Sequence, residues 1–279
     1  MTPAAWFDTA GWIAVVVLAV GWFLERKRRS GSFATTSVAL DYASSLFPIV
    51  LVVMTIKSFV AQPYRIPSPS MYPGLEVGDL VLVSKMSYGF SWPITGTRFL
   101  ATGEPRRGDV VVFEFPGYRC QTRDLRYQNN SPDCSRRSPL RGEQWIKRVV
   151  GLPGDTVEIA GNAVKVNGVQ LEQDEVGAYT TPEAGVPNPM EFVEYSQDRH
   201  YAILLAHEPL PAQPKRSWLV PTGQYFVLGD NRGNSEDSRR WGLVPAGNVR
   251  GRAFMIALNC AGTLCGRRFD LNRIGRGVQ

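Results

Sequence analysis

The chain has 279 residues, of which 44% are hydrophobic and 20% are charged, so it is a folded protein of one large domain or two smaller ones rather than a disordered chain. Only two histidines are present, which argues against a His-based hydrolase or a His-rich metal site. The net charge of +6 is concentrated in Glu25–Arg29 and Arg267–Gln279, whereas a nucleic-acid binder usually spreads a basic excess over a folded face. We therefore expect no nucleic-acid partner.

Two apolar runs near the N-terminus are the first predicted elements. Ala10–Leu24 ends abruptly at the basic segment Glu25–Arg29, and a second run covers Tyr42–Ile56. Extending each run by a few residues reaches the roughly 20 residues that span a bilayer. A signal peptide followed by a buried helix is the alternative, but a signal peptide carries its basic residues before the apolar run. Two membrane helices with a cytoplasmic basic loop are favoured, and the chain after Phe59 then lies outside the cytoplasm.

Four cysteines lie in the part of the chain that is predicted to be outside the cytoplasm. Cys120 and Cys134 flank a polar segment, and Cys260 and Cys265 flank a glycine-containing turn. Four cysteines allow three pairings, and the sequence does not choose among them, although two local bridges are the simplest arrangement in an oxidising compartment. A zinc site is the competing interpretation, and the absence of a CxxC pair disfavours it.

From Arg65 onward the chain is predicted to be mainly β. Short runs rich in Val, Ile, Tyr and Phe alternate with Gly, Pro, Asn and Asp, which is typical of strands joined by turns. Gly161-Asn162 lies between two such runs and predicts a hairpin. The predicted strands are Leu80–Ser84, Val110–Phe115, Trp145–Val150, Val157–Ile159, Ala163–Val166, Tyr201–Leu205, Tyr225–Leu228 and Arg252–Leu258.

The predicted organisation is two N-terminal transmembrane helices followed by an antiparallel β catalytic domain with a smaller inserted β domain. The polar segment 117–142 is expected to be an exposed loop whose role stays open. The expected parts are residues 1–29 (first helix and start of the basic loop), 30–61 (loop and second helix), 62–154 with 218–262 (catalytic β core), 155–217 (inserted β domain) and 263–279 (basic C-terminal tail).

A chain with so few histidines can still perform nucleophilic catalysis with a serine and a lysine. Lysine acts as a base only when it is neutral, and burial among apolar groups favours the neutral form. Lys147 lies inside the apolar run WIKRVVG, where it shares a strand face with Trp145 while Arg148 points the opposite way. By residue type alone, an edge-strand lysine is an equally good interpretation. The Ser/Pro-rich segment Arg65–Met71, judged by residue type alone, is a linker that follows a helix.

Five ordered motifs change this interpretation, because together they resemble the bacterial type I signal peptidases, a family of Ser/Lys serine proteases. The motif PSPSM follows the second apolar run, and GRAFMIALN resembles the final strand of the family. The five motifs are PSPSM (67–71), GDLVLVSKMSYG (78–89), RGDVVVFEFP (107–116), IKRVVGLPGD (146–155) and GDNRGNSEDSRRWG (229–242), and the final-strand segment is GRAFMIALN (251–259).

The resemblance implies roles for individual residues. Ser70 matches the nucleophile and Lys147 the general base. The hydroxyl of Ser68 and the backbone N–H of Ser70 match the oxyanion hole. The residue between the two serines is usually Gly in the family, whereas this chain has Pro69, which leaves its effect on the oxyanion hole open.

Three further residues of the fifth motif match supporting positions. Ser235 matches a serine that orients the lysine amine, and Asp237 and Arg239 match an ion pair near that lysine. No metal or other cofactor is implied.

The resemblance also implies a substrate and a location. The substrates are exported preproteins with signal peptides that end in small residues, bound as an extended chain beside the catalytic strand. The enzyme is expected in the bacterial inner membrane, in contact with the lipid bilayer and with its catalytic domain on the periplasmic side. Met71, Tyr72 and Leu75 either enter the outer leaflet or belong to the core. The oligomeric state and the detailed cleavage preference stay open.

Two other functions are compatible with parts of the sequence. A self-cleaving repressor-type protease uses the same Ser–Lys chemistry, but such proteins lack two membrane spans. A membrane-anchored β domain that binds peptides without cleaving them is the second alternative. The intact set of Ser70, Lys147 and Ser235 argues against it.

Overall fold

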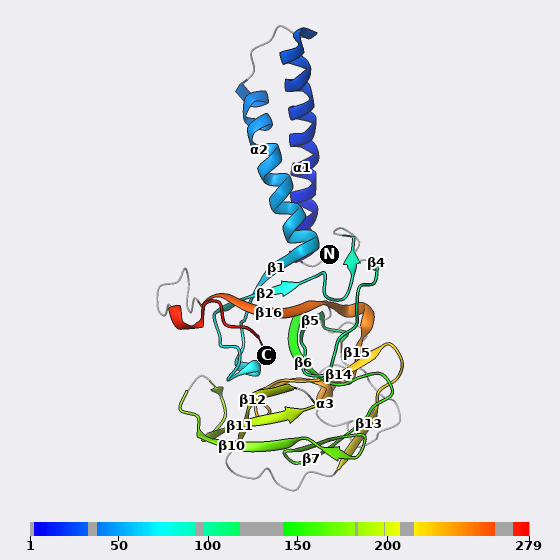
Figure 1. Ribbon diagram of the computed structural model, residues 1–279, viewed down its shortest axis with the longest axis vertical. Coiled ribbons are helices and arrows are strands. Elements are labelled where there is room, and N and C mark those ends of the chain that lie inside the picture. Colours follow the sequence, from blue (N-terminus) through cyan, green and yellow to red (C-terminus); the bar gives the residue numbers. More distant parts are fainter. Residues whose placement is uncertain are drawn as a thin grey trace. The chain divides into compact units, whose positions relative to one another are not determined.

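The structure is a computed structural model in which the chain divides into two compact units (Figure 1). The first unit comprises residues 1–62 and 89–102, and the second comprises residues 63–88 and 103–279. The expected combination of two N-terminal helices and a mainly antiparallel β body is confirmed. The residues described are 3–32, 38–92, 98–117, 142–181, 184–197, 199–206, 215–259 and 270–278.

Two long helices make up most of the first unit. Helix α1 covers Pro3–Lys27 and continues into a π-helical turn at Arg28–Ser32. Helix α2 covers Val38–Thr55 and continues in the same way through Ile56–Val60. The candidate spans Thr9–Ser30 and Val38–Val60, of 22 and 23 residues, are long and apolar enough on average to cross a membrane.

The two helices pack against each other through a small residue and a polar contact. Gly11 of α1 faces the side chain of Met54 on α2, and a Cβ at this position would come too close to Met54 Cε, so the methionine would have to shift. The indole N–H of Trp12 donates a hydrogen bond of 3.1 Å to the hydroxyl of Ser58. Small residues and interhelical hydrogen bonds are the usual means by which membrane helices associate.

A short hairpin of β3 (Phe90–Ser91) and β4 (Arg98–Leu100) belongs to the same unit. The ring of Phe90 contacts that of Phe59 with a centroid distance of 6.4 Å. Trp92, Phe99 and Leu100 expose half or more of their surface. The unit therefore presents exposed aromatic and aliphatic side chains on the hairpin that packs against the end of α2.

A seven-stranded sheet organises the second unit, with the strand order β1-β2-β16-β5-β6-β14-β15. The pairings from β2 through β15 are antiparallel. The strands are β1 (Ala61–Arg65), β2 (Asp79–Ser84), β5 (Val110–Glu114), β6 (Gln144–Gly151), β14 (Gln224–Leu228), β15 (Val244–Pro245) and β16 (Val249–Asn259).

The core of this unit includes the loop that follows β1. Met71, Tyr72 and Leu75 are at most 3% exposed. Met71 and Leu75 belong to the apolar cluster around Val81, and Tyr72 packs with Leu204. Of the two alternatives for these three side chains, the core position is the correct one.

Two smaller sheets complete the second unit. One has four strands in the order β13-β7-β8-β9 and the other has three in the order β10-β11-β12. The predicted hairpin at Gly161-Asn162 is confirmed, because it joins β7 to β8. Whether residues 155–217 are a domain of their own stays a prediction. The strands are β7 (Thr156–Ala160), β8 (Ala163–Val166), β9 (Val169–Gln170), β10 (Glu172–Ala178), β11 (Pro189–Ser196), β12 (Arg199–Ala206) and β13 (Arg216–Leu219).

All eight predicted strands are present, as β2, β5, β6, β7, β8, β12, β14 and β16. Strands β10 and β11 were not predicted individually, because their sequences combine glutamates with few β-branched residues. The four cysteines Cys120, Cys134, Cys260 and Cys265 lie outside the described residues, as does nearly all of the segment 117–142. Their pairing and the zinc alternative therefore stay open.

Candidate active site

The loop that carries Ser70 leaves β1 and returns at β2. Its ends are held by two backbone hydrogen bonds, from the Ile66 N–H to the Asp79 carbonyl at 2.8 Å and from the Gly78 N–H to the Ile66 carbonyl at 2.9 Å. Pro69 begins a 3₁₀ turn, and Ser68 before it is extended with φ −133° and ψ 154°, as a residue preceding proline favours. Ser70 lies in this turn and is buried.

Lys147 lies in the middle of β6, a strand paired with β5 on one edge and, over its second half, with β14 on the other. Its side chain is only 4% exposed. The amine nitrogen lies 2.6 Å from Ser70 Oγ and donates a hydrogen bond of 2.9 Å to the Ile146 carbonyl. The same nitrogen is 5.8 Å from the centre of the Trp145 ring. The fold thus brings together a serine and a lysine that are 77 positions apart.

The environment of Lys147 changes its acidity. Burial lowers the pKa of the amine to about 8, although the carboxylates of Asp237 and Asp230 oppose this by favouring the charged form. At pH 7 about one lysine in ten is therefore neutral, which is the form that accepts a proton.

Ser68 lies beside this pair. Its hydroxyl oxygen is 3.3 Å from Ser70 Oγ, and the residue is exposed. The two serine side chains therefore lie side by side at this turn. Pro69, between them, has no backbone N–H to donate there.

The segment after β14 lies against the Ser70 loop from another part of the chain. The backbone N–H of Asn231 donates to the Ser70 carbonyl and its side-chain amide donates to the Pro69 carbonyl, both at 3.1 Å. Gly229 packs so closely that a Cβ there would collide with the Ser70 carbonyl and the side chain of Ser235. Sequence reasoning did not single out Asn231, whose position inside the fifth motif was the available signal.

Asp237 and Arg239 form the predicted ion pair. The Arg239 guanidinium donates to both carboxylate oxygens of Asp237, at 2.8 and 2.7 Å. Burial alone would raise the pKa of this carboxyl, but Arg239 and the hydrogen bond from the Gly229 N–H hold it below its usual range. Asp237 also accepts from the Arg239 N–H as the N-cap of helix α3 (Ser238–Trp241). The pair thus fixes the backbone at Gly229, directly against the Ser70 peptide.

Ser235 is brought near this group, but not into contact with the lysine amine. Its hydroxyl oxygen is buried over Gly229. Among the described residues, the hydrogen-bond partners of the Lys147 amine are Ser70 and Ile146. The expected hydrogen bond between Ser235 and Lys147 is not formed in this structure.

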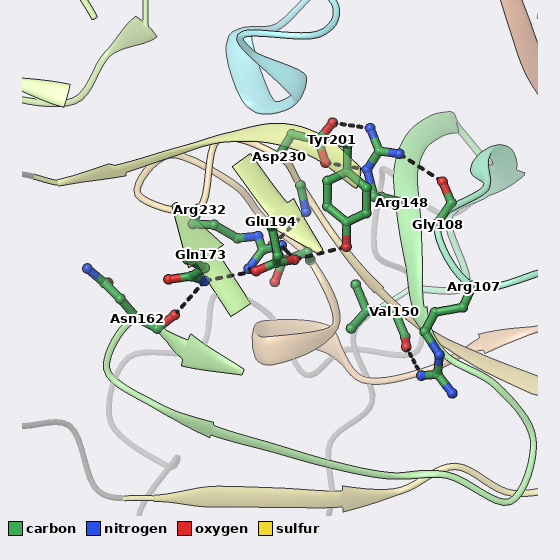
Figure 2. A network of polar contacts seen from close by, with 12 residues as sticks. Arg107, Gly108, Arg148, Val150, Asn162, Gln173, Glu194, Tyr201, Asp230 and Arg232 are labelled. Atoms are coloured by element: carbon green, nitrogen blue, oxygen red, sulfur yellow. Dashed lines mark hydrogen bonds and ion pairs between the residues drawn. The ribbon is translucent and has the colours of Figure 1, made fainter. Parts of the chain in front are cut away.

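Arg148 points away from Lys147, as the alternation of a strand requires. Its guanidinium binds both carboxylate oxygens of Asp230 at 2.7 and 2.6 Å and donates to the Gly108 carbonyl at 2.8 Å. The ring of Tyr201, on β12, packs against this guanidinium (Figure 2), and the Arg148 Cζ atom lies 3.8 Å from the centre of the ring. Because Asp230 immediately precedes Asn231, this pair ties the strand of Lys147 to the segment that holds the Ser70 loop.

The network continues into the three-stranded sheet (Figure 2). Glu194 of β11 is fully buried and binds the guanidinium of Arg232 through both oxygens. It also accepts hydrogen bonds of 2.9 Å from the Tyr201 hydroxyl and the Gln173 amide. Glu194 lies outside every motif, and no local sequence signal identifies it.

Comparison with known proteins identifies the family of the chain. The family model "Signal peptidase, peptidase S26" matches residues 39–258. A signal peptidase I of Pseudomonas aeruginosa is 33% identical over 251 residues, which cover 85% of this chain and 78% of that protein. The corresponding protein of Haemophilus influenzae is 36% identical over 247 residues, or 79% and 70% of the two chains.

A solved structure of a signal peptidase I from Enterococcus faecalis V583 covers 53% of this chain and 96% of that one, at 27% identity and with a TM-score of 0.28. The family model covers well over half of the chain, and the curated relatives match it over most of their own length. By its sequence, the chain belongs to the signal peptidase family, peptidase S26.

Proposed function

We propose that Ser70 and Lys147 carry out the reaction of this signal peptidase, the removal of signal peptides from exported preproteins by a membrane-bound serine endopeptidase. The observation that carries the proposal is the 2.6 Å distance between the Lys147 amine nitrogen and Ser70 Oγ, in a buried setting that lowers the lysine pKa. A serine hydroxyl is a weak nucleophile until an adjacent base accepts its proton.

The reaction then proceeds in two halves. Neutral Lys147 accepts the proton of Ser70 while Oγ attacks the scissile carbonyl carbon, and the lysine returns that proton to the leaving amine of the mature protein. The signal peptide remains bound to Ser70 as an ester. Lys147 next accepts a proton from water, the resulting hydroxide attacks the ester, and the proton passes back to Ser70.

The oxyanion formed in each half requires donors. The Ser68 hydroxyl and the Ser70 N–H supply them, and such a donor typically contributes about 3 kcal/mol to the stability of the transition state. Ser68 suits this role because its hydroxyl lies 3.3 Å from Ser70 Oγ and is accessible. Asp237 and Arg239 act by holding Gly229, against which the Ser235 side chain packs.

The substrate lies beside β6 as an extended chain. The β14 partners of β6 end at the pair of Leu228 with Arg148, so one edge of Trp145–Lys147 lies beyond that pairing. A peptide added there gains main-chain hydrogen bonds and passes the Lys147 amine. A peptide bound this close to β6 has room for small side chains next to the scissile bond. Signal peptides that end in small residues are therefore the substrates that fit.

The lipid bilayer is the second partner. The helices α1 and α2 cross it, and the basic segment Glu25–Arg29 between them lies on the cytoplasmic side by the positive-inside rule. The catalytic unit then lies on the periplasmic side of a bacterial inner membrane. Exposed Trp92 and Phe99 support contact with the lipid interface, where aromatic side chains gather.

Cleavage of a preprotein by the full chain in detergent or in lipid vesicles tests the function. We expect a cut after the small residues of the signal peptide and no cut by Ser70→Ala. A variant that still cleaves at the wild-type rate removes Ser70 from the mechanism. Binding of the preprotein without cleavage by the wild type would instead support the peptide-binding alternative.

A further inference from the structure

We propose that Arg273, near the C-terminus, is a positioning residue that holds the Ser70 loop in its reactive place. The inference rests on the proposed role of Ser70 and assigns a function to a segment that lies outside all the matching motifs. By sequence, this segment is a basic tail.

The segment 270–278 lies along β16. The Gly275 N–H donates to the Ile256 carbonyl at 2.8 Å, and the Ile256 N–H donates to the Arg276 carbonyl at 2.9 Å. Asp270 caps the short 3₁₀ turn Leu271–Arg273 by accepting a hydrogen bond from a backbone N–H within it. The backbone of Arg273 is thereby fixed, and its side chain points inward and is 6% exposed.

The Arg273 guanidinium contacts three residues of the loop that follows Ser70. It donates to the two carboxylate oxygens of Asp79 at 3.0 and 2.6 Å, to the Glu76 carboxylate at 2.7 Å and to the Gly74 carbonyl at 3.0 Å. The guanidinium presents its donors in a rigid planar fork, so one side chain can bind two carboxylates and a carbonyl at once. The Arg273 side chain therefore joins Asp79, the first residue of β2, to the preceding turn at Gly74 and Glu76.

Asp79 is the residue at which the Ser70 loop closes. Its backbone carbonyl accepts from the Ile66 N–H, two residues before Ser68. Its carboxylate also accepts from the Glu76 N–H at 2.8 Å and from the Asn259 amide at 2.7 Å, and it is fully buried. Arg273 is the cation within reach of this carboxylate in the described part of the chain. Without it, the closure of the loop contains a buried charge with no counter-charge.

The position of this loop determines the distance between the two reacting groups. Lys147 belongs to β6 and is fixed by the main sheet, whereas Ser70 belongs to the loop between Ile66 and Asp79. A shift of the loop therefore appears as a change in the Lys147–Ser70 distance. A displacement of about 1 Å in a catalytic group is enough to lower a rate by up to about a hundredfold.

Arg273→Gln tests the inference, with Arg273→Lys as the conservative variant. Arg276→Gln is the matched control, because Arg276 lies three residues further on, is exposed, and its guanidinium donates to the Asn272 carbonyl rather than to a carboxylate of the Ser70 loop. Each full-length variant is assayed on a signal-peptide-bearing preprotein, well below the unfolding temperature of the least stable variant, for kcat, KM and the pH profile.

For Arg273→Gln we expect kcat to fall by about tenfold with little change in KM, because the loop moves the nucleophile and not the strand that binds substrate. The midpoint of the pH profile should not move, because the Lys147 pKa is set mainly by burial and by Asp237 and Asp230, which lie outside the loop that shifts. Arg273→Lys should retain an intermediate kcat, and Arg276→Gln should match the wild type.

A wild-type kcat in folded Arg273→Gln overturns the inference even if its unfolding temperature falls, because the residue is then only structural. A rise in KM with constant kcat overturns it as well. If Arg273→Gln does not fold, the kcat of Arg273→Lys decides in the same way. Failure of the proposed function is distinct, because it appears as wild-type activity in Ser70→Ala.

Discussion

The acidity of Lys147 leads to a quantitative prediction for the dependence of cleavage on pH. Burial lowers the pKa of this amine from 10.5 to about 8. At pH 7 about one lysine in ten is then neutral, against about one in 3,000 for an amine with the ordinary pKa. If neutral Lys147 is the base, kcat/KM rises by about tenfold per pH unit up to pH 8 and levels off above it.

The assay is the initial rate of preprotein cleavage in detergent from pH 6 to pH 10, at substrate concentrations below KM. Lys165→Met is the matched control, because Lys165 lies on the exposed side of β8 and its removal should leave the profile unchanged. A rate that stays constant down to pH 6 would refute the reasoning. A midpoint near the ordinary lysine value would also refute it, since burial would then have no effect.

The same shift has a consequence for stability. The folded protein binds the Lys147 proton more weakly than the unfolded chain does, so this group destabilises the fold below pH 8, and the penalty disappears as the pH rises from about 8 to above 10.5. The shift corresponds to about 3 kcal/mol. Lys147→Met should therefore raise the free energy of unfolding at pH 7 by up to about 3 kcal/mol while abolishing cleavage. A loss of stability at pH 7 would contradict this account.

Three further predictions concern single side chains. Ser70→Ala should abolish cleavage and leave the circular dichroism spectrum unchanged, whereas a wild-type rate would exclude Ser70 as nucleophile. Lys147→Arg should be inactive across the same pH range, because a guanidinium does not lose its proton there, and measurable cleavage would require another base. Glu194→Gln should lower the free energy of unfolding by about 3 kcal/mol in denaturant titrations, because it leaves the buried Arg232 without a counter-charge. Its control, Glu236→Gln, breaks an exposed pair and should cost less than about 1 kcal/mol.

Local patterns in the sequence were sufficient to predict several features of the fold. Short apolar runs predicted eight strands, because a strand in a core alternates or buries its residues whatever its distant neighbours are. The same alternation placed Lys147 and Arg148 on opposite faces of β6, as their different partners confirm. Strands β10 and β11 were missed because they form by pairing with each other and, for β11, with β12, rather than through their own composition.

The family motifs identified the residues of the candidate site but not their contacts. Ser235 matches a residue that contacts the lysine, yet in this structure its hydroxyl packs over Gly229 and does not reach the amine. Asn231 was within a recognised motif and was not singled out, although its backbone and side chain both hold the Ser70 turn. A motif records which residues are present, whereas the hydrogen bonds depend on how two loops meet.

The sequence by itself determined the two apolar N-terminal helices, the mainly β class and the choice of Ser70 and Lys147 as the candidate pair, because each depends on neighbours within a few residues or on an ordered set of motifs. Only the tertiary structure decided that the two groups lie 2.6 Å apart, that Glu194 and Arg232 form a buried pair, and that Arg273 binds Asp79. Those contacts join residues 38 to 194 positions apart. Their formation depends on how sheets and loops pack, which no local periodicity contains.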